Sequence, residues 1–145
     1  FDTLLEMGII PIVNENDSVS YTEIESEERL FGDNDMLSAV VAILCRAQKL
    51  IILSDIDGFY DCDPRLYPNA KRMERITAID EKMQALAGGA GSRRGTGGMK
   101  TKLQAAKLAT AQGIDTVVTN GKSPSALYDI LKGKNIGTLF VGNRI

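Results

Sequence analysis

Short runs of apolar residues followed by polar residues recur along the chain and predict its strands. They cover residues 9–13, 50–53, 115–119 and 137–141. The first two runs are apolar without interruption, a pattern typical of strands that are buried on both faces of a parallel sheet. Asn14 to Asp17 follow the first run, and Ser54 and Asp55 follow the second. Ligands of open α/β sheets bind at the carboxyl ends of strands, so these positions are candidates for a site.

Apolar residues at helical spacing lie between these runs. They predict the end of a helix at residues 1–7, a helix over residues 37–44, and helices over residues 79–87, 98–112 and 124–131. We expect Asp33 or Asn34, Asp80 and Ser123 to act as N-caps of the later helices. Residues 18–31 and 59–75 are polar excursions, the first with a short hairpin strand near its start. The alternation of helices and strands predicts an α/β fold with a mostly parallel sheet.

Composition narrows the functional classes. A chain of 145 residues fits one domain, and its net charge of -2 provides no electrostatic footprint for nucleic acid. It contains no histidine, and its two cysteines have neither a disulfide pattern nor a metal-ligand spacing. No apolar run is long enough to span a membrane, and no signal peptide opens the chain. We therefore expect a cytoplasmic protein with no membrane or nucleic-acid partner.

A glycine-rich stretch leads into the helix over residues 98–112. Six of the 14 glycines fall between Gly88 and Gly98, and the sequence then changes to strong helix formers. Glycines allow close approach of the backbone to a ligand, and the helix start offers free N–H groups to phosphate. Lys100 and Lys102 add cations there. These features favour a phosphate-binding loop, although an ordinary surface loop before a helix would have the same glycine content.

The polar residues suit phosphoryl transfer better than hydrolysis. The chain has no strong nucleophile and no base poised near neutral pH. Transfer of a phosphoryl group depends mainly on positioning and on neutralisation of charge. An acceptor that is already ionised, such as a carboxylate, requires no general base. A kinase that acts on a carboxylate is therefore consistent with the absence of histidine.

Four motifs in order along the chain resemble the amino acid kinase family. They are Val13-Asn14-Glu15-Asn16-Asp17, Phe31-Gly32-Asp33-Asn34-Asp35-Met36-Leu37-Ser38-Ala39, Leu53-Ser54-Asp55 with Gly58-Phe59-Tyr60 and Asp63-Pro64-Arg65, and Gly95-Thr96-Gly97-Gly98-Met99-Lys100-Thr101-Lys102. The resemblance covers essentially all 145 residues and is strongest to members that phosphorylate L-glutamate. It implies a three-layer α/β/α sandwich with a mostly parallel central sheet. Residues 1–145 would form the C-terminal, nucleotide-binding portion of a single kinase domain.

The resemblance also implies an activity and a set of site residues. The reaction would be the ATP- and Mg²⁺-dependent phosphorylation of L-glutamate to L-glutamate 5-phosphate, the first step of proline biosynthesis. Asp35 would organise the lysines, Lys102 would stabilise the transferring phosphoryl group, and Asp17 and Asn34 would bind glutamate, with no protein-held metal. The nucleotide would contact Ser54, Asp55, Thr96, Gly97, Gly98, Met99, Lys100, Thr101 and Lys102. Proline as a feedback inhibitor and a homo-oligomeric state are further expectations from the resemblance.

The sequence departs from the family pattern at its start. The family's phosphate-binding lysine, its glycine-rich loop and a serine that contacts the substrate precede the part that Phe1 to Ile145 resembles. We therefore expect a piece of a longer protein that is nearly inactive alone, and no RNA-binding-type PUA domain after Ile145. Three alternatives remain open: another member of the family acting on acetylglutamate, aspartate or a nucleoside monophosphate; a non-catalytic sensor of amino acids or nucleotides; and the kinase half of a bifunctional pyrroline-5-carboxylate synthase.

Overall fold

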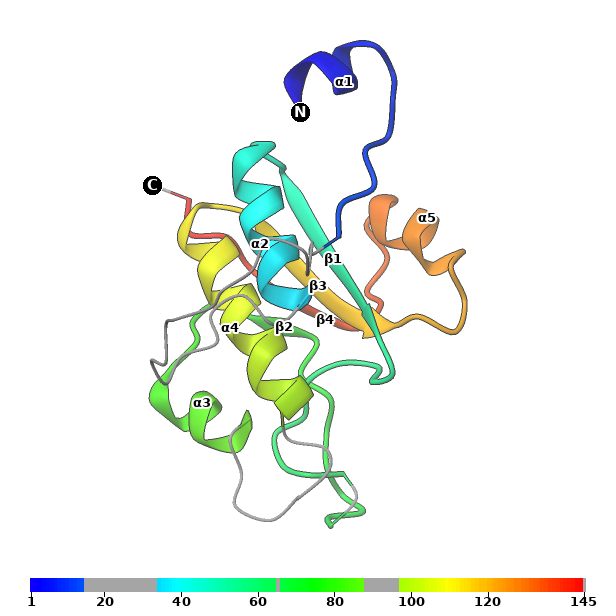
Figure 1. The fold of residues 1–145 in the computed structure, drawn as a ribbon. Coiled ribbons are helices and arrows are strands. Elements are labelled where there is room, and N and C mark those ends of the chain that lie inside the picture. The colour runs from blue at the N-terminus through cyan, green and yellow to red at the C-terminus, as the bar shows by residue number, and fades with distance from the viewer. Residues whose placement is uncertain (15–33, 65, 88–96, 145) are drawn as a thin grey trace, which may run out of the picture.

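The computed structural model describes residues 1–14, 34–64, 66–87 and 97–144. Its helices and strands are interspersed along the chain (Figure 1). In order they are α1 (Asp2–Glu6), α2 (Asn34–Leu44), β1 (Lys49–Ser54), β2 (Arg75–Ile76), α3 (Glu81–Ala87), α4 (Gly97–Ala111), β3 (Asp115–Asn120), α5 (Ala126–Leu131) and β4 (Thr138–Phe140). The predicted α/β class is therefore confirmed.

The four described strands form one mixed sheet in the order β1-β3-β4-β2. β1 and β3 run parallel in a register that pairs Lys49 with Asp115 and Ser54 with Asn120. β2 and β4 are also parallel, whereas β3 and β4 are antiparallel. The paired ends Ser54 and Asn120 lie side by side at the carboxyl edge of the parallel pair.

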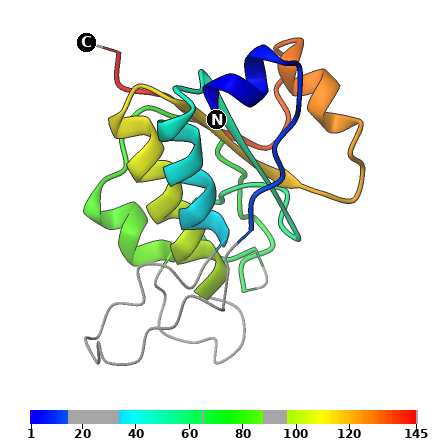
Figure 2. The same ribbon diagram turned by 45° about the horizontal axis from the view of Figure 1, so that its top comes forward.

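Helices cover both sides of this sheet (Figures 1 and 2). α2 and α4 lie side by side over β1 and β3, and α3 packs against α4. α5 lies on the opposite side of the sheet from α2 and α4. The described residues therefore show the three layers that the family resemblance implies.

Small residues in the two main helices let them pack closely. Ala39 of α2 and Ala105, Ala106 and Ala109 of α4 are completely buried. Below the helices, Phe59 and Phe140 meet edge to face with ring centroids 5.1 Å apart. Such close packing fixes the start of α2 relative to the start of α4, because helices this close cannot slide past each other without overlap.

The predicted buried strand over residues 9–13 is wrong. In the structure this segment has no strand, and Ile10 and Ile12 are 87% and 97% exposed. A strand forms only where a second backbone accepts and donates its hydrogen bonds, and none of the described strands pairs with this segment. Its apolar character alone could not supply that partner.

Other expectations differ in detail. α5 begins at Ala126 with Ser125 rather than Ser123 at its N-cap, and no side-chain cap bond forms there; the hydroxyls of Ser123 and Ser125 lie 2.8 Å apart. Asp80 does cap α3, since its Oδ1 accepts the Met83 N–H at 2.8 Å. The cap of α2 at Asp33 and the excursion over residues 18–31 lie outside the described residues. Of the helices described, none has the length and apolar character needed to cross a membrane.

Candidate active site

The first turn of α2 meets the second turn of α4 through Asp35 and the side chains of Thr101 and Lys102. The Lys102 ammonium donates to Asp35 Oδ2 at 3.0 Å, and the Thr101 hydroxyl lies 2.9 Å from the same oxygen. The Asp35 and Lys102 side chains are only 14% and 13% exposed. A charge pair so shielded from water interacts more strongly than an exposed one, because water screens it less.

Positive potential gathers around this pair. The N-terminal turns of α2 and α4 both contain N–H groups without intrahelical partners, and helix dipoles place partial positive charge there. The Lys102 ammonium folds back over the first turn of α4, since a Cβ added at Gly98 would lie 3.8 Å from it. Asp35 balances this charge in part. The arrangement suits an anion bearing several negative charges, such as the phosphates of a nucleotide.

Ser54 and Asp55 lie at the carboxyl end of β1, next to the end of β3. The Ser54 hydroxyl donates to Asp55 Oδ1 at 2.9 Å. This hydrogen bond is the main reason why the pKa of Asp55 lies below its ordinary value, and the charge of Lys102 lowers the pKa further. The exposed Asp55 carboxylate is thus close enough to Lys102 for the charge of the ammonium to favour its ionised form.

The loop after β1 is held from beneath by β4. Thr138 of β4 is fully buried, and its hydroxyl accepts the Phe59 N–H at 2.8 Å and donates to the Met73 carbonyl at 2.6 Å. Further along the loop, the Tyr60 hydroxyl donates to the Asp57 carboxylate, and this bond raises the pKa of Tyr60. The residues that follow Ser54 and Asp55 thus have a fixed position relative to the sheet.

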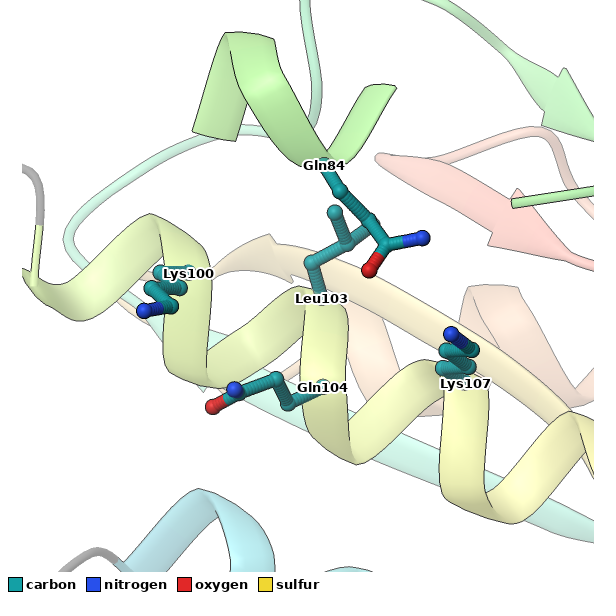
Figure 3. A pocket seen from close by; sticks show the side chains of 5 residues that line it. All are labelled: Gln84, Lys100, Leu103, Gln104 and Lys107. Atoms are coloured by element: carbon teal, nitrogen blue, oxygen red, sulfur yellow. The ribbon is translucent and has the colours of Figure 1, made fainter. Parts of the chain in front are cut away.

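The structure does not bring all predicted site residues together. Lys100 lines a small hollow between α3 and α4 (Figure 3), whereas the Lys102 ammonium reaches Asp35 of α2. The hollow is lined by Gln84, Lys100, Leu103, Gln104 and Lys107. Met99 is half-buried and packs against the core, so its backbone is the part available to a ligand. Asn34 is exposed beside Asp35, and Asp17 and Thr96 lie outside the described residues.

One residue of the site was missed by sequence reasoning. Asn120 ends β3, and its Nδ2 donates to the Asp55 carbonyl at 3.0 Å while its Oδ1 accepts the Lys122 N–H at 2.8 Å. The sequence Asn120-Gly121 predicted only a turn. The tertiary contact could have been suspected from its place, since Asn120 ends a strand in the same way as Ser54.

The part of the chain that the structure describes offers little support for a metal ion held by protein side chains alone. It contains no group of three acidic, cysteine or histidine side chains that could hold a metal ion. The two thiols, Cys45 and Cys62, are free. A cation that acts here would therefore have to obtain most of its ligands from a bound phosphate compound and from water, which is how Mg²⁺ commonly binds.

Solved structures share this fold. A UMP kinase from Bacillus anthracis matches 79% of this chain and 42% of its own chain with a TM-score of 0.58 at 20% identity. A carbamate kinase from Giardia lamblia, solved with AMP-PNP, matches 77% of this chain and 36% of its own with a TM-score of 0.55 at 23% identity. At these identities the likeness establishes the fold alone.

Sequence comparison specifies the family. The amino acid kinase family model matches residues 1–120, and the chain belongs to this family. A glutamate 5-kinase from Clostridium perfringens is 58% identical over 144 residues, which are 99% of this chain and 53% of that protein. A glutamate 5-kinase from Listeria monocytogenes is 50% identical over 143 residues, 99% of this chain and 51% of that protein. The chain spans about half the length of the curated relatives it matches.

Proposed function

We propose that residues 1–145 are the C-terminal, nucleotide-binding portion of a kinase that transfers the γ-phosphoryl group of ATP to the side-chain carboxylate of L-glutamate. The product would be L-glutamate 5-phosphate, and the reaction would be the first step of proline biosynthesis. The names of relatives that are 50–58% identical support the choice of substrate. The main structural support for phosphoryl transfer is the shielded Asp35–Lys102 pair between two helix N-termini.

The chain's own residues suit this transfer. The glutamate carboxylate is ionised at neutral pH, because its ordinary pKa is about 4.3, so it can attack without a general base. The bond between the γ-phosphorus and the β–γ bridging oxygen breaks, a bond from the γ-phosphorus to the carboxylate oxygen forms, and ADP leaves. Lys102 neutralises charge on the transferring group, and Asp35 holds its ammonium in place. Asn34 and Asp17 would bind the amino acid.

Mg²⁺ would enter with the nucleotide. The described residues offer separate carboxylates at Asp35 and Asp55 rather than a cluster of three acids. Such a donor set fits an ion held mainly by phosphate oxygens and water. The ion would supply further neutralisation of charge at the phosphates. Of the two carboxylates, the exposed Asp55 is the one accessible to a hydrated ion, because Asp35 already contacts Lys102 and Thr101.

The remaining nucleotide contacts would come from the loop before α4 and from its first turn. We include Thr96, Gly97, Gly98 and Thr101, together with Met99 and Lys100 through their backbones, because the Lys100 side chain lines the hollow between α3 and α4. We further propose a cytoplasmic homo-oligomer that proline inhibits as a feedback effector, as the resemblance to the family implies. The isolated chain of residues 1–145 would be nearly inactive, because the family's phosphate-binding lysine lies in a part that this chain does not match.

A hydroxylamine-trapping assay tests the substrate. The complete protein is incubated with ATP, Mg²⁺ and L-glutamate, with aspartate and acetylglutamate as parallel acceptors. An acyl phosphate reacts with hydroxylamine to a hydroxamate, so we expect hydroxamate with L-glutamate only. Hydroxamate with another acceptor and none with L-glutamate would contradict the proposed substrate. ATP binding without product from any acceptor would contradict the proposed catalysis and favour a sensor.

A further inference from the structure

Asn120 joins the ends of the two parallel strands at the candidate nucleotide site. Its Nδ2 donates to the Asp55 carbonyl at 3.0 Å across 65 residues of sequence. Next to it, the Gly121 N–H donates to the Ser54 carbonyl at 2.8 Å. The peptide that links Ser54 to Asp55 and the carbonyl that follows it are therefore both tied to the end of β3.

Both ends of the Asn120 amide are engaged. While Nδ2 reaches Asp55, Oδ1 accepts the Lys122 N–H at 2.8 Å and so closes the turn after β3. An amide whose acceptor is fixed in this way has a single orientation, which aims its donor at the Asp55 carbonyl. A turn alone would need only the Lys122 contact. The contact with Asp55 is the part that the turn does not explain.

The hydrogen bond from Asn120 to the Asp55 carbonyl helps to fix the position of the Asp55 carboxylate. Asp55 lies just beyond the end of β1, where the ladder to β3 stops at the Ser54–Asn120 pair. If the Asn120 amide were removed, the Asp55 carbonyl would lose its hydrogen bond to the end of β3. The backbone of Asp55 could then rotate. The Asp55 carboxylate and the Ser54 hydroxyl that donates to it would then move relative to Lys102.

We propose that Asn120 is a positioning residue for ATP binding, which holds Ser54 and Asp55 in the geometry that the nucleotide requires. The inference rests on the proposed kinase function. Asn120 would therefore affect the binding of ATP and leave the binding of the amino-acid substrate unchanged. A residue that merely stabilised the fold would not separate the two substrates in this way.

The test compares two variants at Asn120 with a control at the other end of β3. Asn120→Ala removes both hydrogen bonds, whereas Asn120→Asp keeps the acceptor for Lys122 and removes the donor to Asp55. Asp115→Ala is the matched control, since Asp115 also makes two side-chain contacts, to the Gly142 N–H at 2.9 Å and to Arg144 at 3.2 Å. Each complete protein is assayed for the KM of ATP and of L-glutamate, and for the Kd of Mg²⁺–ATP by calorimetry.

We expect both Asn120 variants to raise the KM and Kd for ATP by about tenfold, the effect of one or two lost hydrogen bonds, with the KM for glutamate changed less than about twofold. Asp115→Ala should lower the melting temperature without changing either KM. Equal changes in both KM values, or an ATP affinity in Asn120→Asp equal to that of the unmodified protein, would overturn the proposal. If the unmodified protein phosphorylates no glutamate, the proposed function fails, while the Kd for ATP still reports on Asn120.

Discussion

The ammonium of Lys102 lies 3.0 Å from the carboxylate of Asp35, although 67 residues separate them in the sequence. The two side chains come from the first turn of α2 and the second turn of α4, which pack side by side through small buried residues. Each is more than four-fifths shielded from solvent. The pair therefore places one cation, with its orientation fixed, at the meeting point of two helix N-termini, where phosphate is favoured.

Replacing Lys102 by Met should abolish most of the proposed activity. The change removes the charge while it keeps much of the side-chain volume, so the transferring phosphoryl group loses its neutralising partner. We expect kcat to fall by about 100-fold or more, the usual effect of removing one preorganised group that stabilises transition-state charge. Steady-state kinetics of the complete protein with ATP and L-glutamate measure this loss.

Lys107 offers a matched control on the same helix. Its side chain is exposed in the hollow between α3 and α4 and makes no ion pair with Asp35. Lys107→Met should therefore change kcat by less than about twofold, since an exposed lysine away from the reacting groups contributes little. Similar losses in the Lys102 and Lys107 variants would indicate a general effect of charge on α4, contrary to the role assigned to Lys102.

Ser54→Ala should raise the pKa of Asp55 toward its ordinary value. The Ser54 hydroxyl donates to the Asp55 carboxylate, and this hydrogen bond is the largest cause of the lowered pKa. Lys102→Met should raise the pKa less, because the lysine contributes only a minor part. Titration of the Asp55 carboxyl carbon by NMR measures both shifts. A larger rise in the Lys102 variant than in the Ser54 variant would contradict this order of causes.

The same hydrogen bond has a defined pH dependence. Because the pKa of Asp55 is lower in the folded protein than in the unfolded chain, the ionised form stabilises the fold. The stabilisation is complete above the ordinary pKa of an aspartate, about 3.9, and is lost as the pH falls through the lowered value. Asp55 is largely exposed, so the effect on the free energy of unfolding should be small.

Local patterns in the sequence predicted most of the fold. The apolar run over residues 50–53 and the helix formers after Gly98 became β1 and α4, because an unbroken apolar run and a run of strong helix formers are both signals contained in the local sequence. β2 consists of only Arg75 and Ile76, too short to leave a pattern, and its partner β4 is distant in sequence. The run over residues 9–13 has the apolar character of a strand but has no described strand beside it. Its failure shows that pairing, rather than composition, creates a strand.

For the candidate site, the sequence could name residues but could not show which of them contact one another. Resemblance to the family named Asp35 and Lys102, but no spacing in the sequence could show that side chains 67 residues apart share one hydrogen bond. The placement of Lys100 away from Lys102 follows from the helix, since residues two apart project to nearly opposite sides. Asn120 escaped attention because its contact with Asp55 exists only once β1 and β3 pair.

Thr138→Val should destabilise the fold although it preserves the shape of the side chain. The Thr138 hydroxyl is fully buried, and it accepts from the Phe59 N–H and donates to the Met73 carbonyl. Valine would leave both backbone groups without this partner, at a cost of about 1–3 kcal/mol for each. We therefore expect a loss of about 2–6 kcal/mol in the free energy of unfolding, measured with urea.

Thr138→Ser distinguishes the contribution of the hydroxyl to stability from that of the methyl group. Serine keeps both hydrogen bonds and loses one buried methyl, which is worth about 1 kcal/mol. The serine variant should therefore be clearly more stable than the valine variant. If valine proved as stable as threonine, the hydroxyl would contribute nothing net, and packing around Phe59 and Phe140 would have to hold the loop after β1.

Gly137→Ala should be far more damaging than Gly133→Ala, although both glycines have a positive φ, of 75° and 84°. The backbone strain of alanine in this region, about 1–2 kcal/mol, is common to both variants. At Gly133 a new Cβ would meet no atom within 4 Å, whereas at Gly137 it would overlap the Val118 carbonyl and the Thr119 side chain of β3. Overlap in a packed interior adds about 1–3 kcal/mol, so Gly137→Ala should lose about 3 kcal/mol or more and Gly133→Ala about 1 kcal/mol. Urea unfolding of the two variants measures the difference; equal losses would show that β4 can move away from β3 at this point, contrary to the close approach that Gly137 permits.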